Sequence, residues 1–358
     1  MNSAGFAHHG GRLGAARAAY THAPQPWIDL STGINPRAYP APRARGVTLN
    51  RLPDTGELSR LEAVAAAAFG VGDPQRVVAT GGTEPALRLL PYILGREAAR
   101  LAGTDPDHGQ KAGVIAEAVI AGPTYGSHAD GWERAGVRAR VVLDSQLEDS
   151  IVDRAALVVV NPNNPDGRIV GRERLRNLHD AVGARGGVLV VDEAFAEVTP
   201  ESSVADIAGS EKAQHLVVLR SFGKFYGLAG LRLGFVVGAP GLMARIRSVI
   251  GDWPVSVDAL AAGLAAYADR EWAQRTRVQL DRFARRLDGV LSRYGFEVVG
   301  GTSLYRLVRA GDATERFERL AAAGILTRPF QHDSSLLRFG LPGTPDAWRR
   351  LSDVLRAG

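Results

Sequence analysis

The strongest constraint on the fold of this chain is a regular alternation of short, apolar, β-branched runs with longer amphipathic stretches. Seven runs are predicted strands: Arg76–Thr80, Gly113–Ile120, Ala139–Leu143, Ala156–Val160, Gly187–Val191, Leu216–Leu219 and Gly234–Val237. Helical patterns between them cover residues 56–69, 85–100, 171–183 and 241–250. Strands that are apolar on both faces and separated by helices form parallel sheets covered on both sides. The sequence therefore predicts an α/β fold with a mostly parallel, seven-stranded sheet.

A different pattern begins near residue 253. One long helical pattern runs from Ser256 to about Tyr294, and a last helix opens at Thr344-Pro345-Asp346, a capping residue followed by proline. Short predicted strands (Glu297–Val299, Ser303–Leu307, Ile325–Arg328 and Leu336–Phe339) flank a helix near Ala313–Ala323. We therefore expect a large α/β domain at residues 46–252, and a smaller α+β domain formed by residues 1–45 and 253–358.

Composition excludes several classes of protein. The 358 residues are 45% hydrophobic and 23% charged, which is ordinary for a globular protein large enough for two domains. No apolar run reaches the roughly 18 residues that a membrane helix needs, and the N-terminus has no signal-like apolar core. The absence of cysteine rules out disulfides, thiolate metal sites and cysteine nucleophiles. We expect a cytoplasmic protein with no membrane partner.

The net charge of +5 is compatible with nucleic acid, but arginines alternate with acids and no basic run or zinc-finger spacing is present. An anionic small substrate explains a mildly basic protein equally well. We therefore expect a small-molecule partner and no nucleic acid.

Lysine is rare in this chain, which draws attention to Lys224. Only three of the 43 basic residues are lysines, and two of them, Lys111 and Lys212, stand in polar settings typical of the surface. Lys224 instead lies in Ser221-Phe222-Gly223-Lys224-Phe225-Tyr226-Gly227, directly after an apolar strand. Only an amine that can lose its proton forms a Schiff base, and arginine cannot. The sequence favours a chemical role for Lys224.

Other polar groups stand at the same structural position, just after a predicted strand. They are Gly82 and Thr83 in Thr80-Gly81-Gly82-Thr83-Glu84, Asn164 in Asn161-Pro162-Asn163-Asn164-Pro165, Asp192, and Ser221 with Arg232. Each segment alone also fits an ordinary turn. Ligands of open α/β sheets bind outside the carboxyl ends of the strands, so the set predicts one cleft there. A glycine-rich helix start suits a phosphate, and a buried Asp192 needs a cationic partner.

Ser221-Phe222-Gly223-Lys224 also matches the Ser-x-x-Lys of penicillin-binding proteins and β-lactamases. Those enzymes need a Lys-Thr-Gly as well, and no lysine of this chain precedes threonine. The sequence excludes that alternative.

Taken together, these residues resemble the fold-type I pyridoxal-phosphate enzymes of the class I/II aminotransferase group, over nearly the whole chain. The resemblance implies that Lys224 carries pyridoxal 5'-phosphate (PLP) and that Asp192 pairs with its pyridine nitrogen. It also implies that Asn164 binds the ring hydroxyl and Tyr125 stacks on the ring. Gly82, Thr83, Ser221 and Arg232 would hold the phosphate, and Arg338 the substrate carboxylate.

Within that group, His9-Gly10-Gly11 and Asp29-Leu30-Ser31-Thr32-Gly33-Ile34-Asn35-Pro36 resemble the opening of the threonine-phosphate decarboxylases of cobalamin biosynthesis. Phe195 fits as well, since related histidinol-phosphate aminotransferases usually have tyrosine there. The resemblance implies substrate contacts by His9, Asn35 and Arg328, a phosphorylated amino acid as substrate, and a homodimer. Two departures stand out: Leu52 replaces a tyrosine that in relatives reaches the neighbouring subunit's cofactor, and Gly33 interrupts an Asn-Ile-Asn triplet.

Two other functions stay open. A histidinol-phosphate-type aminotransferase would use nearly the same residues, because only the bond broken at Cα differs. A non-catalytic, PLP-binding transcription regulator would need an attached DNA-binding domain, for which these elements leave no residues.

Overall fold

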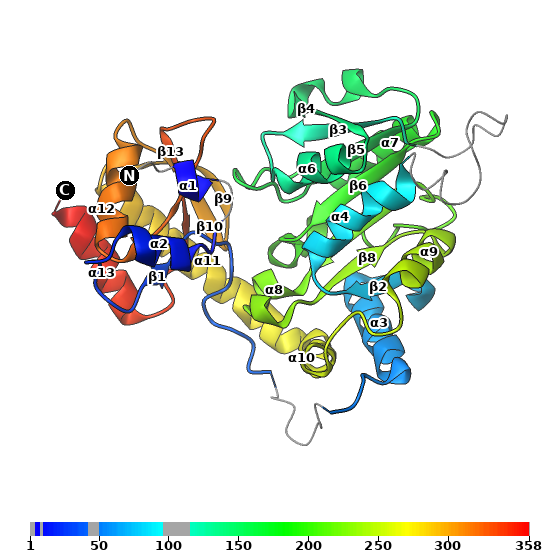
Figure 1. The fold of residues 1–358 in the computed structure, drawn as a ribbon, viewed down its shortest axis with the longest axis horizontal. Helices are drawn as coiled ribbons and strands as arrows, with labels where there is room; N and C mark the ends of the chain where they lie inside the picture. Colours follow the sequence, from blue (N-terminus) through cyan, green and yellow to red (C-terminus); the bar gives the residue numbers. More distant parts are fainter. Residues whose placement is uncertain (1–3, 8–9, 42–49, 96–114, 358) are drawn as a thin grey trace.

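The computed structural model describes residues 4–7, 10–41, 50–95 and 115–357. Two bodies lie side by side, and one long helix, α11 (Arg270–Arg293), runs from beneath the larger body to the smaller one (Figure 1). Both visible termini belong to the smaller body (Figure 1). The expected boundary between residues 45 and 46 lies outside the described residues.

The larger body is built on a seven-stranded sheet with the order β2-β8-β7-β6-β5-β3-β4. The strands are β2 (Val77–Thr80), β3 (Glu117–Gly122), β4 (Arg138–Leu143), β5 (Ala155–Val160), β6 (Val188–Glu193), β7 (Leu216–Ser221) and β8 (Gly234–Val237). All neighbours are parallel except β8, which is antiparallel to both β2 and β7. The predicted seven-stranded, mostly parallel sheet is confirmed.

Helices cover both faces of this sheet, as its fully apolar strands require. Side chains of α3 (Thr55–Phe69), α7 (Arg172–Gly183) and α10 (Val257–Ala268) share one buried cluster with alternate strand residues such as Leu157 and Val159. Those of α4 (Thr83–Leu94), α6 (Ser127–Arg134) and α9 (Pro240–Ile250) share the other, with Val158 and Val190. The strand ends are therefore fixed from both sides.

The smaller body contains a four-stranded antiparallel sheet of order β12-β13-β10-β9. These are β9 (Glu297–Thr302), β10 (Tyr305–Arg309), β12 (Arg328–Pro329) and β13 (Leu336–Gly340), with α12 (Ala313–Ala322) and α13 (Pro345–Arg356). Thr344 caps α13 by accepting from the Ala347 N–H, as its sequence predicts. From the N-terminal segment, which includes α1 (Ala4–Ala7) and α2 (Leu13–Ala19), β1 (Ile28–Asp29) pairs with β11 (Ile325–Leu326).

The prediction of one helix from Ser256 to Tyr294 is wrong in one respect. The helix breaks at Asp269, whose carboxylate accepts the Trp272 N–H and so starts α11 anew. The alanine-rich and arginine-rich stretches on either side both favour helix, which hides the break from a pattern-based reading. Among the described residues, no helix is both long and apolar enough to cross a membrane.

Candidate active site

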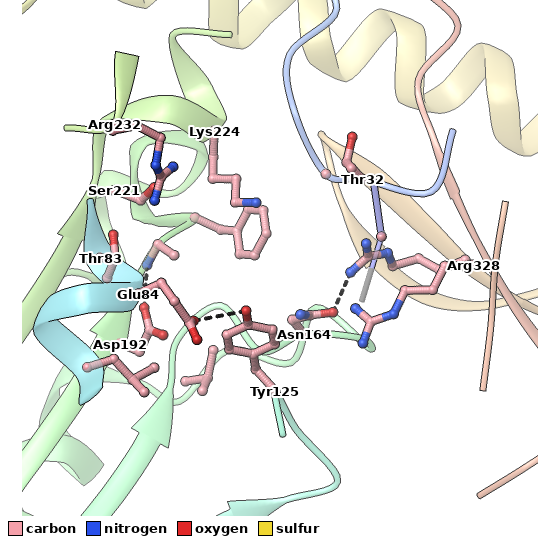
Figure 2. A pocket seen from close by; sticks show the side chains of 17 residues that line it. Thr32, Thr83, Glu84, Tyr125, Asn164, Asp192, Ser221, Lys224, Arg232 and Arg328 are labelled. Carbon is pink, nitrogen blue, oxygen red and sulfur yellow. Dashed lines mark hydrogen bonds between the residues drawn. The ribbon is translucent and has the colours of Figure 1, made fainter. Parts of the chain in front are cut away.

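A pocket opens between the two bodies at the carboxyl ends of the central strands (Figure 2). From the larger body it is lined by Thr83, Tyr125, Asn164, Asp192, Ser221, Lys224 and Arg232. The N-terminal segment contributes Gly10, Thr32 and Gly33, and the smaller sheet contributes Arg328 and Arg338. Its space, the open mouth included, is about 980 Å³. The structure thus brings most of the predicted polar residues together.

Lys224 lies in α8 (Phe222–Phe225), the single helical turn that follows β7. This turn packs closely on the 3-10 turn at Ala229–Leu231, since a Cβ at Gly223 would lie only 2.6 Å from the Cα of Ala229. Figure 2 shows the Lys224 amine extending into the pocket. Burial, together with the positive charge of Arg338, lowers the pKa of Lys224 to about 8. A larger fraction of this amine than of an ordinary lysine is therefore neutral, and nucleophilic, near neutral pH.

Asp192 is the last residue but one of β6, and it is buried while lining the pocket. One oxygen accepts from the Ala194 N–H at 3.0 Å, and the other lies 2.9 Å from Nε2 of His128. His128 belongs to α6, which the sequence analysis did not predict, and it is also buried. Two donors therefore hold the Asp192 carboxylate in place. In the sequence, the apolar Trp132 stands four residues after His128, which puts both on the buried face of one helix, but nothing there points to the bond between His128 and Asp192.

Tyr125 is oriented by Glu84, a second residue that the sequence analysis missed. The tyrosine hydroxyl donates to Oε2 of Glu84 at 3.0 Å, and Oε1 of Glu84 accepts from Nε of Arg88 at 2.8 Å (Figure 2). Burial, with the neighbouring Glu84 charge, raises the pKa of Tyr125 to about 12. The phenol is thus neutral and its ring is fixed at one side of the pocket.

The start of α4 forms a cradle suited to an anion. Gly82, its N-cap, has a φ of +104°, and a Cβ there would lie 2.5 Å from a terminal nitrogen of Arg232. Only glycine allows both the backbone conformation and this close approach. Ser221 lies at the end of β7, and Thr83 begins the 12-residue helix α4, whose first N–H groups attract negative charge.

Two arginines from the smaller sheet form the opposite wall. Arg328 and Arg338 face each other across the β12–β13 pair, and both are buried. The Arg338 guanidinium donates to Oδ1 of Asn164 and, at 2.7 Å, to the Ser31 carbonyl. Burial next to Arg328 lowers the pKa of Arg338 to about 9, so it remains cationic at neutral pH. Among the described residues no carboxylate forms an ion pair with Arg338, although the charge of Asp29 acts on it from further away, so this wall is suited to an added anion.

Two of the predicted residues stand apart from this pocket. Asn35 does not line it: its amide donates to the Phe225 carbonyl at 2.9 Å, and its backbone N–H donates to the Lys224 carbonyl at 2.9 Å. Asn35 therefore holds the Lys224 turn, and the substrate contact implied for it stays a prediction. Leu52 is 65% exposed and does not reach the pocket of its own chain. His9 lies outside the described residues.

Comparisons with known proteins identify the family. Residues 27–355 match the model of aminotransferase class I and II. The chain belongs to this family. A histidinol-phosphate aminotransferase of Sinorhizobium meliloti, solved in complex with pyridoxal-5'-phosphate, has the same fold, with a TM-score of 0.77 at 19% identity over 96% of this chain and 94% of that one.

Among the relatives of this class I and II aminotransferase chain are two threonine-phosphate decarboxylases. That of Pseudomonas aeruginosa is 35% identical over 97% of this chain and 96% of its own length. That of a Sinorhizobium species is 37% identical over 97% of both chains. A histidinol-phosphate aminotransferase of Aeromonas hydrophila is 30% identical over 90% of this chain and 88% of its own.

The pocket fits the cofactor of the class I and II aminotransferases, PLP. Because Gly82 has no Cβ, the guanidinium of Arg232 approaches the start of α4 closely and adds a cationic fork beside its first N–H groups. Lys224 offers an amine with a lowered pKa, and Asp192 a buried carboxylate. These groups match the phosphate, the aldehyde and the pyridine nitrogen of PLP in charge and chemistry.

Proposed function

We propose that this protein is a PLP-dependent lyase that decarboxylates L-threonine O-3-phosphate to (R)-1-amino-2-propanol O-2-phosphate in cobalamin biosynthesis. The observation that carries the proposal is the similarity to two threonine-phosphate decarboxylases over 97% of the chain. The site agrees with it, because a phosphorylated amino acid brings two anionic groups to a wall with two buried arginines.

In this proposal, PLP is held along the strand ends of the larger body. Lys224 would bind it covalently, Asp192 would pair with its ring nitrogen, Asn164 would contact its ring hydroxyl and Tyr125 would stack on the ring. The phosphate is bound by Gly82, Thr83, Ser221 and Arg232. When bound, PLP supplies an electron sink for the electron pair that a broken bond leaves at the substrate Cα.

The substrate lies between that cofactor and the smaller sheet. Arg338 binds the carboxylate, since its planar fork suits a bidentate anion and its neighbours are neutral oxygens. Arg328, on the opposing strand, contributes the second positive charge toward the substrate. His9 is a further candidate for the substrate, and Gly10, one residue later, lines the pocket.

Lys224 is the group that moves protons. Its amine, whose pKa is lowered to about 8, can hold a proton at neutral pH and give it up again. When the bond between Cα and the carboxylate breaks and CO₂ leaves, Lys224 would deliver a proton to Cα. His128 and the Ala194 N–H hold the Asp192 carboxylate, which would pair with the ring nitrogen of PLP.

We also propose that the protein acts as a homodimer in the cytoplasm. Five large apolar side chains of the described residues are each more than half exposed: Leu52, Val141, Leu143, Val249 and Trp253. Such side chains favour burial against another protein surface.

Acceptor-free turnover separates this function from the histidinol-phosphate-type aminotransferase. Purified holoenzyme with threonine phosphate should release CO₂ and the amino alcohol phosphate in equal amounts, without any 2-oxo acid. An enzyme that releases no CO₂, but forms glutamate from histidinol phosphate and 2-oxoglutarate, would instead be the aminotransferase. Failure of both reactions in a protein that binds PLP would favour the regulator.

A further inference from the structure

Four parts of the chain meet around the side chain of Tyr305, which lies behind the pocket wall rather than in it. Tyr305 begins β10 and is fully buried. Its hydroxyl donates to the carbonyl oxygen of Asn163 at 2.5 Å, so the smaller sheet holds the residue directly before Asn164. Burial raises the pKa of the Tyr305 phenol, which therefore stays protonated and able to donate.

The ring of the same tyrosine supports two pocket residues. The guanidinium of Arg338 lies over it, 5.0 Å from the centroid, at the distance of a cation–π contact. The ring of Phe195 packs edge-on against it at 5.1 Å. On the third side, a Cβ at Gly33 would lie 2.7 Å from the ring, so the N-terminal segment also presses on Tyr305. The ring has no room to shift without moving one of these groups.

The loop that carries Asn164 is also held by bonds within itself: the Asn163 carbonyl accepts from the Gly167 N–H at 2.8 Å, and the Asn163 N–H donates to the Arg168 carbonyl at 2.8 Å. The Asn163 side chain is engaged on its far side, accepting from Thr124 at 2.6 Å and donating to the Pro123 carbonyl at 3.0 Å. A second contact with the smaller sheet joins the Gly301 N–H to the Asp166 carbonyl at 2.6 Å. Tyr305 and Gly301 therefore bind the chain on either side of Asn164, at Asn163 and Asp166. Of these two residues of the smaller sheet, Tyr305 is the one whose ring contacts Arg338.

We propose that Tyr305 is a positioning residue that fixes the Asn164 amide and the Arg338 guanidinium in one shared geometry. It touches neither cofactor nor substrate and acts through these two residues. The inference rests on the proposed function, in which Asn164 contacts the cofactor ring and Arg338 the substrate carboxylate. A change at Tyr305 then alters the electronic state of the cofactor and the affinity for a carboxylate together.

Tyr305→Phe tests this, since it removes only the hydroxyl. The matched control is Tyr267→Phe: Tyr267 is also buried, and its hydroxyl has no hydrogen-bond partner among the described residues. For each holoenzyme, three quantities are measured: the pH midpoint at which the visible absorption of bound PLP changes, KM and kcat for threonine phosphate, and the melting temperature.

We expect Tyr305→Phe to move the absorption midpoint by about half a pH unit or more. It should also raise KM about two- to tenfold, the change in affinity expected when one hydrogen bond is lost. Tyr267→Phe should change neither quantity. A lower melting temperature with an unchanged midpoint and KM would make Tyr305 merely structural and overturn the proposal, as would identical behaviour of the two variants.

Gly33→Ala provides a second test. The added methyl group would push on the Tyr305 ring, so it should change both the absorption midpoint of bound PLP and KM. The absorption midpoint needs no turnover. If the wild-type protein does not decarboxylate threonine phosphate, the proposed function fails while the spectroscopic result still decides the role of Tyr305.

Discussion

The Nε2 atom of His128 lies 2.9 Å from Oδ2 of Asp192, and both side chains are buried. A buried carboxylate that loses one of its donors is destabilised by about 1–3 kcal/mol. We therefore expect His128→Leu to lower the free energy of unfolding by about this amount, and to weaken PLP binding because Asp192 is no longer held. Urea unfolding and absorbance titration of the cofactor-free protein measure the two effects.

His179→Leu is the matched control for this variant. His179 is buried as well, but its Nε2 has no hydrogen-bond partner among the described residues and it lies in α7, away from the pocket lining. It should change stability without changing PLP affinity. Equal PLP affinity in wild type and His128→Leu would show that His128 does not position Asp192.

The lowered pKa of Lys224 predicts a specific pH dependence of stability. The lysine titrates near pH 8 in the folded protein, against 10.5 for an ordinary lysine. Between these values the unfolded chain binds more protons than the folded one, so the Lys224 contribution to the free energy of unfolding rises with pH. Lys224→Met should remove this rise and be the more stable protein below pH 8.

Urea unfolding of the cofactor-free proteins from pH 7 to about pH 10 gives the comparison, because all other titrating groups are common to both. Parallel pH profiles would contradict the assigned pKa. In the same series, Lys224→Arg keeps a cation but should no longer be linked covalently to PLP after borohydride treatment. A covalent adduct in Lys224→Arg would place the attachment elsewhere.

Gly82→Ala should disrupt the phosphate cradle. The φ of +104° is strained for alanine by about 1–3 kcal/mol, and the new methyl group would displace Arg232. We expect weaker PLP binding, measured as the dissociation constant in a phosphate-free buffer. Gly241→Ala is the control, since nothing lies within 4 Å of a Cβ at this α9 position. If both variants bind PLP as the wild type does, Gly82 is not part of the phosphate site.

Arg338→Ala should weaken substrate binding more than any other single change in the smaller sheet. Loss of a buried, charge-assisted contact with a carboxylate costs about 2–5 kcal/mol, which appears in KM or kcat/KM. Arg338→Lys should recover little, because an ammonium lacks the fork that contacts both Asn164 and Ser31. Arg309 provides the control. It is an exposed residue of β10 that pairs with Asp333, and Arg309→Ala should leave KM unchanged.

The sequence predicts the larger sheet well because its inner strands, such as β5, are short β-branched runs buried on both faces, whereas the edge strand β4 carries two arginines and is partly exposed. Strands such as Leu216–Ser221 and Gly234–Val237 begin where their apolar runs begin. The break at Asp269 escapes prediction, since a single capping carboxylate decides it within helix-forming sequence. Periodicity carries no information about one such hydrogen bond.

For the site, sequence order predicts which residues follow the strands but not what holds them. Lys224, Asp192, Asn164 and Tyr125 line one pocket as expected. His128 and Tyr305 come from segments distant in the chain, and their contacts depend on how helices and the smaller sheet pack. For Asn35, the resemblance implies a substrate contact that stays a prediction, and it gives no sign that the amide binds the Phe225 carbonyl.

The fate of the hydrogen on the substrate Cα tests the central claim most directly. Threonine phosphate carrying deuterium at Cα is incubated with the holoenzyme in ordinary water, without a 2-oxo acid, and the products are analysed by mass spectrometry. Decarboxylation breaks the bond to the carboxylate, so we predict CO₂ and an amino alcohol phosphate that retains the deuterium. Deuterium lost to solvent, with no CO₂ released, would show that the enzyme breaks the Cα–H bond and would contradict the account.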